Sequence, residues 1–226
     1  MAKSNRFIPS GLVGHWRFQG LSGSNRRGTI VDQSGNGNNG TIYGAPALSF
    51  DGTNDKAAVD TPWDALSGHR YAVIAVRVFV DADVANRALF DVQHNDAVNG
   101  KITYMISDTD KLKLLARAGG SGDSSTIFTS DSGLTENAWH SLLVQVDVEG
   151  DTMTFWDNGT LLASTGNAQE FSQDTFAADV PNVQVFGELA GGSYDLTGRM
   201  KWMGYGGLDT PVTITDAQQY YDNPQA

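Results

Sequence analysis

One segment near the N-terminus has the oxygen-rich pattern of a cation-binding loop. Oxygen-bearing side chains alternate from Asp32 to Asn36, and Gly37 occupies the sixth position, as in the first half of a calcium loop. The twelfth position is Tyr43 instead of a bidentate glutamate, so the segment is not an EF-hand. One interpretation is a structural Ca²⁺ held by Asp32, Asn36 or Asn38 together with backbone carbonyls. The other is a plain Asx-type turn.

Four aromatic residues stand outside the regular apolar patterns and are candidates for stacking on the faces of pyranose rings. Trp156 has the opposite parity to Met153 and Phe155, which predicts that it lies on the outer face of its strand. The alternative for each residue is that it caps an end of the folded core. The candidate carbohydrate-binding residues are Tyr43, Trp63, Trp156 and Tyr194.

Catalytic motifs are missing from the sequence. The chain contains no cysteine, no Gly-x-Ser-x-Gly motif and no run of closely spaced glutamates that could serve as the carboxylate pair of a glycosidase. Its four histidines show no metal-ligand spacing. Residues 35–40 match G-x-G-x-x-G, but the residues that follow are strand-like and not helical, so no nucleotide site is predicted. We therefore expect no catalytic residues and no enzyme activity.

The balance of charge also excludes some partners. The formal net charge is −11, with 26 acidic residues against 15 lysines and arginines. Such a surface repels a phosphate backbone, so we expect no nucleic acid as a partner. No stretch approaches the roughly 20 apolar residues that a transmembrane helix needs, so we expect no membrane insertion.

The elements that must position these residues are short strands. Residues 71–80 form a β-branched run that is apolar on both faces apart from Arg77, as expected for a strand covered on both sides. Residues 101–107, 141–148 and 152–155 alternate apolar and polar positions, which predicts one face in the core and one facing out. Asn-Gly and Gly-rich turns separate these runs, among them Asn158-Gly159. This pattern is typical of a β-sandwich.

Several blocks in this order resemble the laminin-G-like and concanavalin-like lectin-glucanase family. They are Gly11 to Phe18, Asp32 to Ile42, Leu48 to Asp55, Ala138 to Val146, Phe155 to Gly159 and Leu196 to Trp202. The resemblance implies an all-β, two-sheet antiparallel jelly-roll sandwich over residues 11–226. It also adds weight to the calcium interpretation, since related jelly rolls often bind calcium. We expect Trp16, Trp139 and Trp202 to fill the layer between the two sheets.

The two ends of the chain differ from the strand-rich middle. Thr215 to Gln218 fits a capping box and predicts one short C-terminal helix. Residues 1–10 are basic and precede the first strand pattern. They are either a frayed terminus or an arm that docks on a neighbouring subunit.

We expect a non-catalytic structural or adhesion module of a bacteriophage virion, as a capsid decoration or tail-fibre-associated protein. The reason is that an extracellular type of fold here lacks a signal peptide and disulfides, and lysis releases phage proteins without secretion. It would be made in the host cytoplasm and displayed on the virion surface. Its partners would be other virion proteins, or a second copy of the chain, through residues 1–10. The alternative is an extracellular, free-standing carbohydrate-binding module that recognises a surface glycan, and a third hypothesis is a glycoside hydrolase of the same fold.

Overall fold

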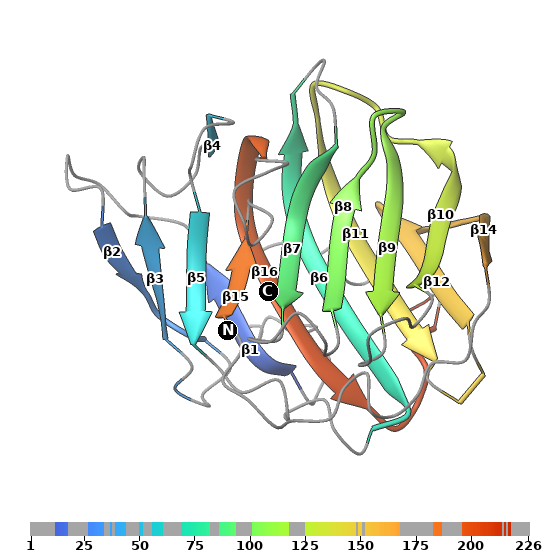
Figure 1. Ribbon diagram of the computed structural model, residues 1–226, viewed down its shortest axis with the longest axis horizontal. Coiled ribbons are helices and arrows are strands. Elements are labelled where there is room, and N and C mark those ends of the chain that lie inside the picture. Colours follow the sequence, from blue (N-terminus) through green and yellow to red (C-terminus); the bar gives the residue numbers. More distant parts are fainter. Residues whose placement is uncertain are drawn as a thin grey trace, which may run out of the picture.

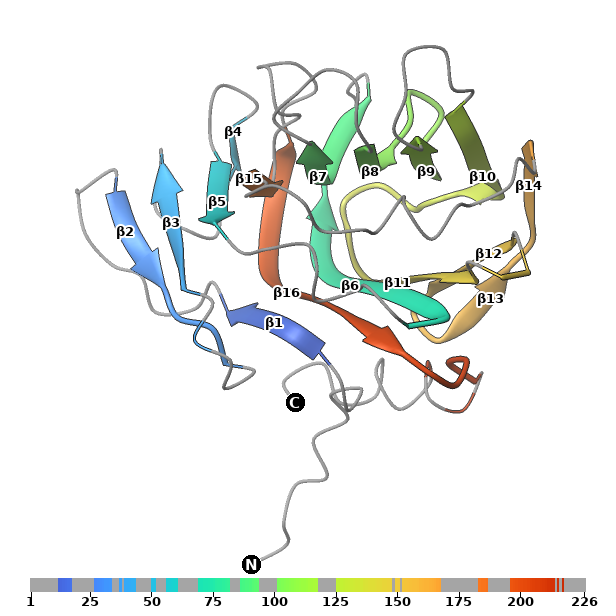
Figure 2. The same cartoon turned by 60° about the horizontal axis from the view of Figure 1, so that its bottom comes forward.

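The chain forms two antiparallel β-sheets packed face to face, and Figure 2 shows sheet B arching over sheet A. This confirms the predicted β-sandwich. The computed structural model describes residues 12–17, 27–33, 37, 39–43, 50–51, 56–60, 69–81, 86–93, 101–117, 125–147, 149–150, 152–167, 183–186, 196–213, 215 and 217. The predicted arm at residues 1–10 lies outside this part of the chain and stays a prediction.

Sheet A lies behind sheet B in Figure 1 and has the strand order β1-β16-β6-β11-β12-β13, with β4 pairing to β16. β1, β16, β6 and β11 are neighbours in the sheet but far apart in sequence, because the chain passes back and forth between the sheets as in a jelly roll, whereas β11, β12 and β13 follow one another directly. The strands are β1 (Leu12–Arg17), β4 (Phe50–Asp51), β6 (Tyr71–Val80), β11 (Ala138–Asp147), β12 (Thr152–Asp157), β13 (Thr160–Leu162) and β16 (Thr197–Leu208).

Sheet B lies in front in Figure 1 and has the order β14-β10-β9-β8-β7-β15-β5-β3-β2. Its strands are β2 (Arg27–Ile30), β3 (Gly40–Tyr43), β5 (Lys56–Asp60), β7 (Arg87–Gln93), β8 (Lys101–Ile106), β9 (Lys111–Arg117), β10 (Ser125–Gly133), β14 (Ser164–Asn167) and β15 (Val183–Phe186).

The main core fills the space between the two sheets. Strand β6 contributes its even-numbered residues, and β11 and β12 contribute Val144 and Phe155 beside it. Sheet B contributes Tyr104, whose ring stacks on that of Phe155 with the centroids 6.4 Å apart. The predicted alternation therefore places one face of each strand in this core.

The outer face of sheet A is also covered over part of its area. A second cluster contains residues from four strands and from the segment after β16: Val73, Ala75, Leu143, Trp156, Trp202, Val212 and Ala217. Val212 and Ala217 come from the segment after β16, and the amide of Val212 donates a hydrogen bond to the Gln145 side chain. The prediction that β6 is covered on both sides is confirmed. The prediction that the odd-numbered positions of β11 are exposed was wrong at Ser141 and Gln145, which are both buried.

The tryptophan prediction was wrong for two residues. Trp202 belongs to the outer cluster, and Trp139 pairs with Phe79 on the same outer face. Neither lies between the sheets, because both occupy strand positions of the parity opposite to the inner core. The side chain of Trp16 lies outside the described part of the chain.

Two local predictions concern turns and helices. Asn158 and Gly159 have φ values of 49° and 77°, and Asp157 pairs with Thr160 across them. This is the two-residue hairpin that an Asn-Gly pair favours, as predicted. Thr215 and Ala217 have helical backbone, and the rest of the predicted C-terminal helix lies outside the described residues. Within the part of the chain that the structure describes, no helix has the length and apolarity needed to cross a membrane.

Candidate functional site

The structure separates the four predicted carbohydrate-binding residues. Tyr43 lies in β3, and its side chain is outside the described part. Trp63 and Tyr194 lie wholly outside the described residues. Trp156 is on the outer face of β12, as its parity predicts, but it is only 4% exposed because Val212 and Ala217 cover it. A ring buried in this way offers little surface to a sugar, so the structure does not favour the role predicted for Trp156, which stays a prediction.

The predicted calcium loop is described in part. Asp32 is buried, and its backbone amide donates to the side-chain oxygen of Asn39 at 3.1 Å. Gly37 has a φ of 79°, so it takes the left-handed conformation at the reversal of the chain. Asn36 and Asn38 lie outside the described residues, and no cluster of three His, Cys, Asp or Glu side chains fit for a metal occurs in the described part. A calcium ion at Asp32 stays a prediction, which calorimetry with Ca²⁺ on chelator-treated protein tests.

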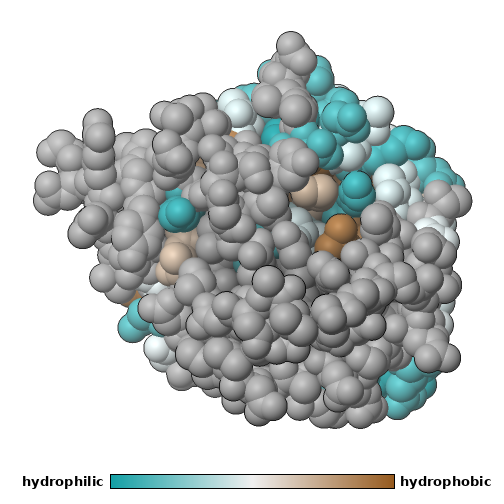
Figure 3. All heavy atoms as spheres, in the orientation of Figure 1, coloured by the Kyte–Doolittle hydropathy of each residue, from teal (hydrophilic) through white to brown (hydrophobic). Residues whose placement is uncertain are grey.

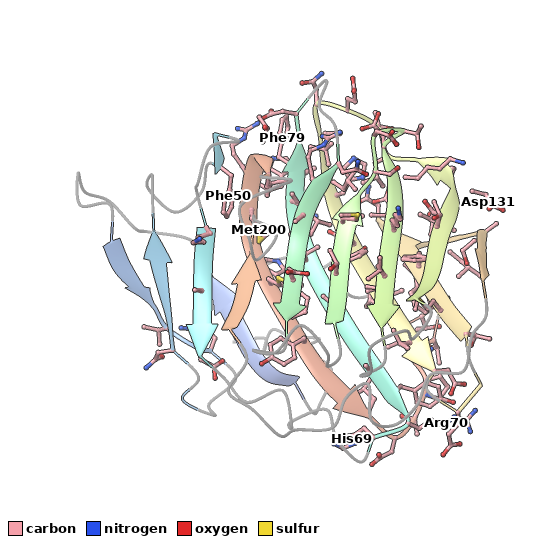
Figure 4. All side chains as sticks on the ribbon, viewed as in Figure 1. Phe50, His69, Arg70, Phe79, Asp131 and Met200 are labelled. Carbon is pink, nitrogen blue, oxygen red and sulfur yellow. The ribbon has the colours of Figure 1, made fainter. Side chains whose placement is uncertain are left out.

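Three neighbouring strands bring aromatic and basic side chains together beside the area of sheet A that the described residues Val212 and Ala217 cover. Phe79 of β6 pairs with Trp139 of β11 on one side and with Arg199 of β16 on the other. The register of β16 shifts between Met200 and Trp202, which places Lys201 at an irregularity of the strand. We call this set the basic aromatic face: Arg77, Phe79, Trp139, Arg199 and Lys201. Figure 4 shows Phe79 at the upper end of β6, far from His69 and Arg70 at the lower end.

The contacts within the basic aromatic face are cation–ring contacts. The rings of Phe79 and Trp139 meet edge to face with centroids 5.6 Å apart. The Arg199 guanidinium lies 3.8 Å from the centre of the Phe79 ring. Lys201 Nζ lies 4.9 Å, and the Arg77 Cζ 5.8 Å, from the Trp139 ring. These contacts hold the cations in place on a rigid sheet.

The cations of this face differ from the other described arginines in their partners. Arg70 bonds to Asp147 and Glu149, and Arg87 bonds to Asp110. Among the described residues, Arg77, Arg199 and Lys201 make no contact with a carboxylate. Arg77 Nη1 donates to the hydroxyl of Ser141, while its buried Nε has no hydrogen-bond partner. The face therefore presents positive charge that the described chain does not neutralise.

His140 lies beneath this face and fixes the start of β11. Its side chain points into the sandwich, opposite to that of Trp139, and is 3% exposed. Nε2 lies 2.7 Å from the carbonyl oxygen of Thr135, and Nδ1 lies 2.9 Å from both carboxylate oxygens of Asp157. Both partners are acceptors, so the site favours the imidazolium form, in which both ring nitrogens donate. Burial alone would lower the pKa of His140, but the bonds and charge of Asp157 and the bond to Thr135 raise it above the usual 6.5.

This arrangement predicts a pH dependence of stability. Because the pKa of His140 is raised on folding, its contribution is present below pH 6.5 and is lost as the pH rises through the folded-state value. We expect the melting temperature to fall over that interval by about 2–4 °C for each kcal/mol lost. In H140Q the fall should be absent, and in H69Q, which changes the half-exposed His69, it should persist. The melting temperature is measured by calorimetry from pH 5.5 to 9. If it changed with pH equally in wild type and H140Q, His140 would not be the group responsible.

The opposite side of the molecule gives a weaker candidate. Figure 3 views the outer face of sheet B, where the described surface is mostly hydrophilic with a small hydrophobic area. Asp91 of β7 and Thr103 of β8 are buried there and bond to each other. Their polar groups are already paired, which leaves them less suited to bind a ligand than the basic aromatic face.

Sequence reasoning did not single out the basic aromatic face. Arg77 was visible as the break in an apolar run, and Trp139 and Lys201 fell within the family-like blocks. No signal linked them, because three segments from distant parts of the chain form the face. Only the strand order β16-β6-β11 brings them together.

Comparison by sequence gives no match to a family model and none to a curated protein. The fold matches solved structures of low identity. A carbohydrate-binding module, "Ruminococcus gnavus IT-sialidase CBM40 bound to alpha2,3 sialyllactose", has a TM-score of 0.51 and 12% identity over 67% of this chain and 83% of that chain. A Trypanosoma rangeli sialidase in complex with sialic acid has a TM-score of 0.62 and 11% identity over 96% of this chain.

The match covers 34% of the Trypanosoma rangeli chain, so this protein spans about a third of that sialidase. A third structure, described as NanB plus Optactamide, has a TM-score of 0.53 and 14% identity, over 75% of this chain and 26% of that one. At such identities the likeness establishes the fold. The chain thus shares its β-sandwich fold with a carbohydrate-binding module and with part of a larger sialidase chain.

Proposed function

We propose that this protein is a non-catalytic carbohydrate-binding module, the alternative reached from the sequence. The observation that carries the proposal is the ring pair Phe79–Trp139, with centroids 5.6 Å apart, on the adjacent strands β6 and β11 of sheet A. Both rings are half-buried, so each keeps part of its surface open to solvent. Glycan sites commonly combine such ring surfaces with a few fixed polar groups. Strands hold these side chains more rigidly than loops do.

The similar structures support this proposal. One is a carbohydrate-binding module bound to α2,3-sialyllactose, and another is a sialidase in complex with sialic acid. Both share the two-sheet architecture that positions the face here. A binding role also accords with the described carboxylates, several of which are engaged by cations. Asp147 is held by Arg70, which lowers its pKa, and Asp157 by His140. Its lowered pKa makes Asp147 a poor general acid.

A glycan array probed with the labelled full chain tests the proposal. We expect binding to a defined set of glycans, and a loss of about tenfold or more in W139A, as for a tryptophan that anchors a ligand. L161A, which removes an exposed side chain from β13, is the matched control and should bind like wild type. W139F keeps an aromatic ring in contact with Phe79 and serves as a second variant if W139A does not fold. If the folded wild-type protein bound no glycan on a broad array, the proposed function would be wrong.

The virion role stays a prediction from the sequence. It concerns residues 1–10, which lie outside the described part of the chain. Mass spectrometry of purified particles tests attachment, and size-exclusion chromatography tests association with a second copy. A monomer absent from particles would exclude that role without affecting glycan binding.

A further inference from the structure

The basic aromatic face concentrates positive charge on an acidic protein. The chain has 15 lysines and arginines against 26 acidic residues. Three of these cations gather around one indole ring, with Arg77, Arg199 and Lys201 all within 5.8 Å of its centre. Like charges held this close repel one another unless an anion lies between them. Binding an anionic ligand would therefore relieve the electrostatic repulsion between these three cations.

The described chain supplies no such anion. Arg70 and Arg87, whose side chains are also described, each bond to a carboxylate and so have a structural role. Among the described residues, Arg199 is exposed and contacts only aromatic rings, and Arg77 bonds to the hydroxyl of Ser141 but to no carboxylate. A binding site for an acidic group needs such donors, held in place and not yet bonded to an acceptor.

The geometry also limits the ligand to one that carries a ring. Arg199 stacks its flat guanidinium on Phe79 at 3.8 Å, which leaves the N–H groups at its edge free to donate. Trp139 presents a half-buried indole beside these donors. An anionic group bonded to the guanidinium would place an attached pyranose against the indole.

We propose that the basic aromatic face recognises a sugar that bears an anionic group. The anion is held by Arg77 and Arg199 with added attraction from Lys201, and the sugar ring lies against Trp139. This inference rests on the proposed glycan binding and names the class of glycan. Carboxylate and sulfate groups share the required chemistry.

Titration calorimetry of the full chain tests this with three probes. They are α2,3-sialyllactose, 3′-sulfated lactose and neutral lactose. We expect at least one charged probe to bind ten times more tightly than lactose, and to weaken several-fold between 50 and 300 mM salt. The preferred charged probe then identifies the anion as carboxylate or sulfate.

Two double variants, each of which removes two positive charges, distinguish binding at the basic aromatic face from general electrostatic attraction to the protein. R199Q/K201Q should weaken the charged probe at least tenfold. K111Q/K113Q removes two half-buried lysines of β9 in sheet B. It should change the affinity for the charged probe less than twofold. Equal binding of lactose and the charged probes, or equal effects of the two variants, would overturn the inference and leave glycan binding standing. No binding of any glycan would overturn the proposed function itself.

Discussion

Replacing Asp110 with asparagine is expected to lower the free energy of unfolding by about 3 kcal/mol, near the lower end of the range for breaking a buried ion pair. Arg87 is fully buried, and its guanidinium bonds to the Asp110 carboxylate and to the carbonyl of Asp81. Without the carboxylate, a buried positive charge loses its counter-charge. Asparagine keeps the size of the side chain and tolerates the φ of 57° at this position, so the change removes charge and little else.

Urea unfolding followed by tryptophan fluorescence measures this loss, which should lower the denaturation midpoint without altering the slope. D108N is the matched control, because Asp108 lies in the same turn, is exposed and has no described ion pair. It should change stability by less than about 0.5 kcal/mol. A D110N protein as stable as D108N would show that the Arg87–Asp110 pair contributes nothing to the fold.

The change Phe155→Ala is expected to cost about 3–5 kcal/mol, the usual range for removing a buried phenylalanine. Phe155 is 0% exposed and belongs to β12 of sheet A, and its ring stacks on Tyr104 of β8 in sheet B. The truncation therefore opens a cavity between the two sheets. It also removes a ring contact that joins them.

Thermal unfolding by calorimetry measures this effect, with L161A as the reference because Leu161 on the neighbouring strand β13 is 51% exposed. The reference should melt within a few degrees of wild type, whereas F155A should melt at least about 6 °C lower. Similar melting temperatures for the two variants would show that the contact between the sheets at Phe155 does not stabilise the sandwich.

The sequence predicted the fold well because strand patterns are local. The period-two alternation and the Asn158-Gly159 pair each depend on residues close together in the chain. Residues 71–80 were predicted as a strand covered on both sides, and β6 has the same bounds and two apolar faces. Parity also placed Trp156 correctly on the outer face of β12.

The basic aromatic face was less predictable because it depends on which other segments cover the outer face of sheet A. Parity does not reveal that the segment carrying Val212 buries Trp156 and leaves Trp139 half-buried. The position of Lys201 depends on an irregular register of β16, which no local pattern signals. The partners of His140, Thr135 and Asp157, favour its charged form, and no local pattern in the sequence signals these contacts.

The most direct test of glycan binding at the basic aromatic face is a ¹H–¹⁵N NMR titration that follows the tryptophan indole N–H signals, assigned with W139F. With α2,3-sialyllactose, or the charged probe that calorimetry prefers, we predict a saturable shift of the Trp139 signal with the Kd found by calorimetry. The signals of Trp156 and Trp202, buried in the outer cluster, should stay in place. Saturable binding that leaves the Trp139 signal unmoved would contradict the account.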